Sequence, residues 1–283
     1  MATPPYKISV FARVNGYSQP DSIVQWNDSI LVGFGNNVAK DGTDSKFSTI
    51  VQYSLRGKVE RTFHVKGHND GLRLISDDDL WALQNEDGNP SLVVIELSSG
   101  TQKTYTFAPT VHAGGYDDIV VRNGQIFMTT SNPNLNSASV NVFPALVRVK
   151  LAGSMVTVEP VLNGDANGID IPTGAPVTLN LMDPDSLTID PRGNIVLDDQ
   201  ADSQLVFIRN PFRENQKVGR INITRCTGAP PCAPRPTATT MDDTAFAPTP
   251  RAFLLVADLT GNAIYRIDSP PFGFEPGVAA LCF

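Results

Sequence analysis

Short runs of alternating apolar and polar residues, separated by Gly, Pro, Asn and Asp turns, repeat along most of the chain. In the clearest copy, Asp185 opens an alternating strand, residues 190–193 form a tight turn, and residues 195–197 form a second strand. A polar turn then leads to a third strand at residues 205–208. This order predicts a β-meander whose first strand begins at an acidic residue.

The same phrase recurs at four other places, which begin at Asp21, Asp70, Asp117 and Asp242. Successive opening acids are roughly 50 to 70 residues apart, close to the ~40–50 residue period of propeller blades with insertions in the later copies. A fourth strand is expected in the first three units, at residues 59–65, 101–107 and 155–161. The sequence therefore predicts an all-β fold, a β-propeller of four-stranded antiparallel blades.

The whole chain, residues 1–283, is expected to form one propeller domain with five recognisable units. Residues 6–14 alternate like a strand and are expected to join the last blade and close the ring. Two blade counts stay open: a five-bladed ring, or the six-bladed type with this chain holding five units, which the apolar C-terminal residues favour. Residues 162–181 and 225–240 are expected to be loops between units.

Charge and composition argue against nucleic acid and lipid membranes as partners. The formal net charge is −7 and the pI about 4.9, whereas nucleic-acid binding needs clustered Lys and Arg. The apolar runs are far too short to cross a bilayer, and no run shows a helical 3.6-residue period. A monomer that binds a cation and a small molecule at the mouth of the central channel is the expectation.

The compartment depends on the cysteines and on the N-terminus. Cys226 and Cys232 flank a Pro-rich loop and could close a small disulfide, which would place the protein outside the cell or in the periplasm after removal of a leader. The given N-terminus lacks a signal sequence, so two free thiols in a cytoplasmic protein are the alternative.

The repeated acids are the main candidates for chemistry, because the first strand of each blade lines the channel of a propeller. They would form a ring of carboxylates at one mouth: Asp21, Asp70, Asp117, Asp185 and Asp242. The ends of the second strands lie at the same mouth and add Asn37, Asn85, Asn132, Asp199 and Asp258. Crowded carboxylates must be protonated, hydrogen-bonded or neutralised by a cation. A hard divalent ion, Ca²⁺ or Mg²⁺, would satisfy them.

A structural role for the acids is the alternative. An Asp before a strand can accept hydrogen bonds from backbone amides two residues on and fix a turn in every blade. On that interpretation only two or three members of the ring bind a ligand. His68 and His112 precede the second and third units at the same mouth, and either could act as a general base or be a loop histidine without a chemical role.

Three phrases, PDSLTIDPRGNIVLDDQ, HNDGLRLISDDDLWALQ and LLVADLTGNAIYRI, resemble blade sequences of the SMP-30/gluconolactonase/luciferin-regenerating-enzyme group, and more loosely those of NHL-type and paraoxonase-like propellers. In the first group a Glu, Asn residues and the Asp of a PDG phrase bind a divalent cation that polarises a lactone or ester carbonyl. Asp185 resembles the PDG aspartate and Asn69 a family asparagine. Asp21 stands in place of the Glu, Asp117 or Asp118 in place of an Asn, and Ser186 in place of the Gly.

The resemblance implies a metal-dependent lactonase or esterase with Ca²⁺ held by Asp21, Asn69, Asp117 and Asp185. Asp185 or His68 would activate water. A non-catalytic propeller that binds a ligand or protein through its rim loops is the main alternative. A lyase of the virginiamycin-opening kind is a third, although the sequence shows no clear catalytic His and Glu arrangement for it.

Overall fold

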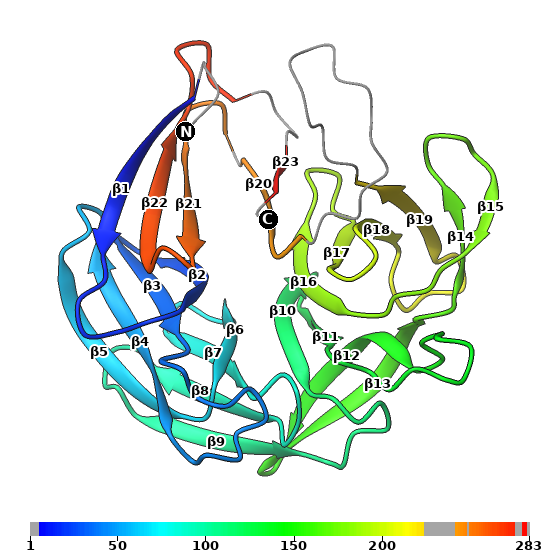
Figure 1. Ribbon diagram of the computed structural model, residues 1–283, viewed down its shortest axis with the longest axis horizontal. Helices are drawn as coiled ribbons and strands as arrows, with labels where there is room; N and C mark the ends of the chain where they lie inside the picture. The colour runs from blue at the N-terminus through cyan, green and yellow to red at the C-terminus, as the bar shows by residue number, and fades with distance from the viewer. Residues whose placement is uncertain (1–5, 224–240, 248, 275–278, 282–283) are drawn as a thin grey trace.

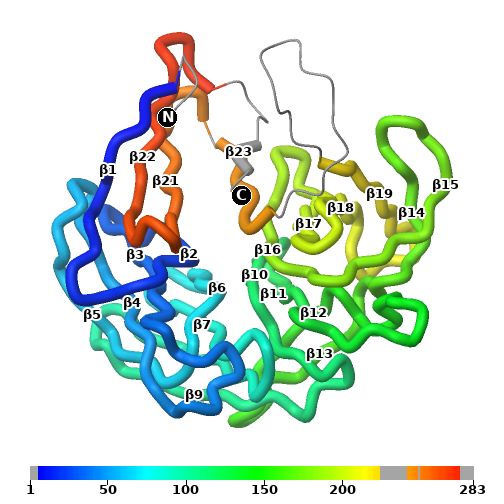
Figure 2. The backbone as a smooth tube through the Cα atoms, viewed as in Figure 1, coloured from blue at the N-terminus to red at the C-terminus, as the bar shows by residue number. Residues whose placement is uncertain are grey.

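The computed structural model describes residues 6–223, 241–247, 249–274 and 279–281, and within them every regular element is a β-strand. Four meanders of four antiparallel strands each follow one another round a common centre (Figure 1), and a short parallel pairing joins the second and third of these sheets into one of eight strands. In the described part of the chain no helix is long and apolar enough to cross a membrane. The predicted all-β class is confirmed, and Figure 2 shows the same propeller-like path of the backbone.

The first three sheets are meanders in which each strand pairs with the next. The first contains β2 (Pro20–Trp26), β3 (Ser29–Phe34), β4 (Phe47–Ser54) and β5 (Val59–Lys66). The second contains β6 (Asn69–Leu74), β7 (Asp79–Gln84), β8 (Ser91–Glu96) and β9 (Gln102–Phe107). The third contains β10 (Tyr116–Arg122), β11 (Gln125–Thr130), β12 (Pro144–Ala152) and β13 (Met155–Asn163).

The fourth sheet is larger than the sequence predicts. Its meander contains β16 (Pro184–Ile189), β17 (Ile195–Asp199), β18 (Gln204–Arg209) and β19 (Lys217–Asn222). The segment expected to be a loop, residues 162–181, instead forms a hairpin of β14 (Asn167–Asp170) and β15 (Pro176–Thr178), and β14 pairs in parallel with β19. The hairpin covers the outer edge of the sheet, where unpaired backbone groups would otherwise face solvent.

The fifth unit departs from the predicted four-stranded meander. β21 (Phe253–Asp258), β22 (Ala263–Asp268) and the N-terminal strand β1 (Lys7–Arg13) form a three-stranded sheet. β20 (Thr244–Phe246), the expected first strand of this unit, pairs with β23 (Ala279–Leu281) and not with β21. β1 lies along β22 at the rim of the molecule (Figure 1). The number of blades stays a prediction, and Cys226 and Cys232 lie outside the described residues.

Apolar side chains fill the spaces between successive sheets. Strands such as β3 and β17 are buried along their whole length, as expected for central strands rich in β-branched residues. Separate buried clusters lie between the first and second, second and third, and third and fourth sheets, and between the first sheet and β1–β22–β21. The sheets are therefore held face to face, and the first strands of neighbouring units lie next to one another.

One close approach between inner strands requires glycine. A Cβ on Gly71 of β6 would lie 2.2 Å from the carbonyl oxygen of Asp117 on β10. Because backbone cannot move aside as a flexible side chain can, we expect Gly71→Ala to destabilise the protein by about 3 kcal/mol, measured by urea unfolding. The control is Gly88→Ala, where the nearest atom would lie 3.7 Å away. Equal stability of the two variants would contradict this packing.

Candidate functional site

A β-bulge marks the opening acid in each of the four complete sheets. The strand pairing shifts register between Pro20 and Ile23, and the same shift occurs at the three equivalent places: Asn69/Leu72, Tyr116/Ile119 and Pro184/Leu187. A bulge sets two residues against one on the partner strand and redirects their side chains. In each of these sheets the opening acid and the residue after it are therefore the two residues of a β-bulge.

The two bulge residues have different roles. The second one holds neighbouring sheets together: Ser22 accepts a hydrogen bond from the Leu72 amide at 2.9 Å, and Asp118 Oδ2 accepts one from the Leu187 amide at 2.8 Å. The first residue, the opening acid, is then free to face the centre. The structural role expected for the acids belongs, in these two units, to the residue that follows.

Four of the five opening acids, Asp21, Asp117, Asp185 and Asp242, line a central cavity of about 740 Å³, whereas Asp70 is buried outside the lining. Acidic residues dominate its lining: Asp21, Glu86, Asp87, Asp117, Asp118, Asp183, Asp185, Asp242, Asp243 and Asp258. The basic residues of the lining are Lys40 and His68. Burial raises the pKa of Asp21 to about 8, and the negative charges of Asp242 and Glu86 add to the effect. The cavity therefore favours protons or cations.

Glu86, Asp117 and Asp185 form a group of neighbouring carboxylates in this cavity. Each contributes an oxygen, and these atoms all lie within 4.8 Å of one another. Burial raises the pKa of both Asp117 and Asp185 well above the usual value, and nearby carboxylates, Glu86 among them, raise both further. The interaction between the two side chains raises the pKa of Asp117 and lowers that of Asp185, so Asp117 is the one that holds a proton more readily.

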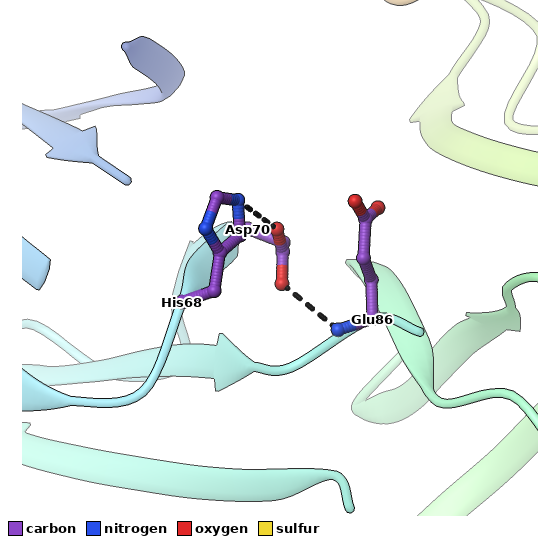
Figure 3. A group of neighbouring side chains, drawn as sticks. All are labelled: His68, Asp70 and Glu86. Atoms are coloured by element: carbon purple, nitrogen blue, oxygen red, sulfur yellow. Dashed lines mark hydrogen bonds and ion pairs between the residues drawn. The ribbon is translucent and has the colours of Figure 1, made fainter. Parts of the chain in front are cut away.

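His68, Asp70 and Glu86 form a second group on the side of the second sheet, and Figure 3 shows their side chains next to one another. His68 Nδ1 lies 2.9 Å from the carbonyl oxygen of Val38, so Nδ1 carries a proton. His68 Nε2 lies 3.3 Å from Asp70 Oδ1. Two bare acceptors would repel at this distance, so one proton lies between them.

Burial is the main cause of the pKa shifts in this second group. It lowers the pKa of His68 and raises that of Asp70 well above the usual value, with Glu86 and Asp21 raising the latter further. These directions place the shared proton on Asp70, which can donate it to a neutral His68. His68 is thereby held as a neutral base at the wall of the cavity.

Lys40 reaches the cavity from the loop between β3 and β4 and forms an ion pair with Glu86. Burial opposes the charged form of Lys40, but Glu86 outweighs it, and the pKa of Lys40 is raised. The loop is fixed to the second unit, since the Asp87 amide donates to the Lys40 carbonyl at 3.1 Å. Lys40 is therefore a fixed positive charge beside the carboxylates.

The predicted site residues separate into three sets. Asp117 and Asp185 lie together, and Asp21 and His68 line the same cavity. Asn69 does not line it: this side chain is fully buried, and its Nδ2 donates to the Leu83 carbonyl at 3.0 Å. The role of Asn69 as a metal ligand stays a prediction.

Of the other residues expected at the mouth of the channel, some line the cavity and some do not. Asn132, Asp242 and Asp258 line the cavity. Asn85 has a positive φ of 67° and its Oδ1 accepts from the His68 amide at 2.9 Å, so it shapes the backbone beside the site. His112 is outside the lining and is buried with its Nε2 2.7 Å from the Gly115 carbonyl.

Sequence reasoning missed Glu86 and Lys40. Glu86 directly follows Asn85 in the phrase at the end of the second strand, a position already expected at the mouth of the channel. A charged residue next to an expected ring member was the available signal. Lys40 stands in a long polar loop, and nothing in the sequence indicates that this loop turns toward the centre.

Comparisons with solved structures identify propellers with the same fold. A virginiamycin B lyase from Staphylococcus aureus matches with a TM-score of 0.56 at 12% identity, over 93% of this chain and 99% of the lyase. A putative gluconolactonase matches with a TM-score of 0.51 at 12% identity, over 96% and 95%. A Bacteroides thetaiotaomicron protein of unknown function matches with a TM-score of 0.50 at 11% identity, over 93% and 76%.

No protein-family profile and no curated protein sequence matches the chain. The predicted resemblance to the SMP-30/gluconolactonase group is confirmed as a likeness of fold. At such low identity the likeness concerns the fold alone, and function has to be argued from the cavity.

Proposed function

We propose that the protein is a metal-dependent hydrolase of the lactonase or esterase type. The observation that carries the proposal is the convergence of Glu86, Asp117 and Asp185 in one cavity, with oxygens within 4.8 Å of one another. Their substrate would be a small molecule that enters this cavity. The chain would work as a monomer, because the proposed ligands come from three sheets of one chain.

The donor set fits a hard divalent cation, with Ca²⁺ preferred. Ca²⁺ binds six to eight oxygen ligands in flexible geometry, and carboxylates are its common protein ligands. Oxygens of Asp117 and Asp185 lie within 4.8 Å of each other, so one cation could be bound by both. Asp21, which lines the same cavity, is a further ligand in this proposal. Bound at these carboxylates, the cation would polarise the carbonyl of a lactone or ester.

The base of this proposed reaction is His68. It lines the cavity, its Nδ1 is fixed on the Val38 carbonyl, and its Nε2 is backed by Asp70. These contacts orient the imidazole, but they also occupy both of its nitrogens. His68 can therefore take up the proton of an attacking water at Nε2 only when Asp70 is ionised, and the imidazolium that forms is then paired with the Asp70 carboxylate. Asp185 is the alternative base, in which case its carboxylate must be ionised.

A lyase is the second candidate, and a specific observation favours it. His68 and Glu86 lie in one group, which supplies the His and Glu arrangement that the sequence did not reveal. A base that removes a proton next to the scissile bond would open a lactone by elimination instead of by attack of water. The two reactions give different products from the same substrate.

The test is the metal content of the purified protein together with its melting temperature in chelator and after addition of Ca²⁺. We expect a stoichiometric divalent ion and a rise in melting temperature of several degrees at saturating Ca²⁺. Active fractions should hydrolyse lactones or esters in a Ca²⁺-dependent manner. In ¹⁸O-labelled water, hydrolysis labels the acid product, whereas elimination yields an unlabelled unsaturated product.

Three outcomes separate the candidates. Bound ion with labelled product supports the hydrolase. Bound ion with an unsaturated product replaces it with the lyase. If no ion binds and no ester or lactone is consumed, both enzymes are excluded and a non-catalytic binding platform remains.

A further inference from the structure

The walls of the central cavity differ in character. Most of the acids come from the first four units, and Asp242, Asp243 and Asp258 of the fifth unit add to them. The side formed by β21, β22 and the turn between them also contributes apolar groups: Val256, Ala257, Leu259, Tyr265 and Ile267. A cavity that only bound a cation and a polyhydroxylated substrate would not need an apolar wall, and on this side Asp258 and Thr260 are the polar residues of the described lining. The apolar side is therefore a property that the cation site does not explain.

Strand register shows that this wall is part of a continuous apolar face. Tyr265 on β22 lies between Val10 on β1 and Val256 on β21. One row further along, Ile267 lies between Ile8 and Leu254. Residues two apart on a strand point to the same side, so these six side chains share one face of the sheet.

This face is not the one that holds the sheet in the fold. The intervening residues Ala12, Leu255 and Ile264 belong to the core cluster shared with the first sheet. On the other face, Ile8 and Val10 are 44% and 42% exposed, and Val256, Tyr265 and Ile267 are half-buried. The sheet thus has a second apolar face, which runs from the rim into the cavity.

We propose that the ligand of this cavity carries an apolar group that lies on Val256, Tyr265 and Ile267 while its polar end faces the carboxylates. The inference rests on the proposed function and names its substrate class: a lactone or ester with an alkyl or aryl substituent, and not a sugar lactone. The continuity of the face with the acid-lined cavity argues for a ligand of this kind, because both are parts of one surface.

Chain length gives a quantitative expectation. Burying one methylene group is worth about 0.8 kcal/mol, which is about a fourfold change in a dissociation constant. A substituent that contacts the wall should therefore bind about fourfold more tightly for each added methylene until it extends beyond the cavity. A sugar lactone, which would place hydroxyl groups against Val256 and Ile267, should bind weakly.

The experiment uses N-alkyl pyrrolidinones from methyl to hexyl, which share the lactone ring shape and resist hydrolysis. Their affinities for the full chain in Ca²⁺ are measured by isothermal titration calorimetry. We expect a roughly fourfold gain per methylene over the first few members. We expect Val256→Thr, which conserves volume and strand propensity, to weaken hexyl binding several-fold. We expect the same of Ile267→Thr, which conserves strand propensity but also removes one methylene. The control is Val158→Thr, an exposed position on β13 outside the cavity lining.

The outcomes are distinguishable from those of the proposed function. Affinity that does not change along the alkyl series, in the wild-type protein, overturns the inference even if lactones are hydrolysed. Chain-length-dependent binding that Val256→Thr weakens supports the inference even if no turnover occurs, in which case the hydrolase proposal alone fails. A concentration-dependent dimer in sedimentation that Val10→Thr dissociates would assign the face to a second copy and overturn the inference.

Discussion

Asp185→Asn is expected to remove the Ca²⁺-dependent rise in melting temperature and to reduce lactone or ester hydrolysis by a factor of a hundred or more. The variant keeps the shape of the side chain but loses one of the three anionic groups that would bind the cation. Losing a carboxylate lowers the charge of the site, which is a main determinant of Ca²⁺ affinity. The measurement is melting temperature against Ca²⁺ concentration, with initial rates on the same samples.

In chelator the same variant should be more stable than the wild type, by on the order of 5 °C at pH 8. Burial raises the pKa of Asp185, so the folded protein holds a proton that the unfolded chain has lost. Stability of the wild type therefore falls as pH rises above about 4, the ordinary pKa of Asp, toward the raised pKa of the folded state. Asn cannot ionise, and its amide can donate to Asp117.

The gain should vanish below about pH 3, where Asp185 is protonated in both states. Asp77→Asn is the matched control, because Asp77 is exposed in the turn at the far end of the second sheet. A variant that loses bound ion and keeps full hydrolytic activity would contradict the proposed role of Asp185. A variant with no pH-dependent stability gain would contradict the raised pKa.

Glu86 and Lys40 should give changes of opposite sign in cation affinity. Glu86 belongs to both groups of potential ligands, so Glu86→Gln is expected to weaken Ca²⁺ binding by about a hundredfold. Lys40 is ion-paired with the same carboxylate and competes with a cation for it. Lys40→Met keeps the length and the apolar stem of the side chain, and it should strengthen Ca²⁺ binding by about tenfold.

Affinities are compared by calorimetry at fixed pH and low ionic strength, where competition between charges is least screened. Glu214→Gln serves as the control for a lost carboxylate, because Glu214 is exposed and outside the cavity. If Lys40→Met binds Ca²⁺ more weakly than the wild type, Lys40 stabilises the site instead of competing for it.

Most of the fold could be predicted from the sequence because each repeat is marked by short-range sequence patterns. The alternating strands, the turn residues and the opening acids recur in each unit, and their convergence follows from the propeller arrangement. Asp117 and Asp185 could be placed together on that basis, although about 70 residues separate them. The β-bulge that directs the acids inward has no separate signal in composition or periodicity.

The remaining features depend on contacts that no local pattern records. Lys40 meets Glu86 because its loop is fixed by backbone bonds to the next unit, such as that from the Asp87 amide. β20 carries the same introductory acids as the other first strands, Asp242 and Asp243, yet it pairs with β23. The local sequence of β20 allows pairing with β21 or with β23. Which of the two forms depends on contacts in the whole molecule.

The pairing of β1 with β22 has a consequence for how the protein is made. Lys7 is aligned with Asp268, so β1 cannot pair with β22 until the residues between them have been synthesised. At roughly 5–20 residues per second, β1 waits on the order of ten seconds or more. Throughout that time its apolar Ile8 and Val10 are uncovered on an unpaired strand, so the nascent chain offers an early binding site for chaperones.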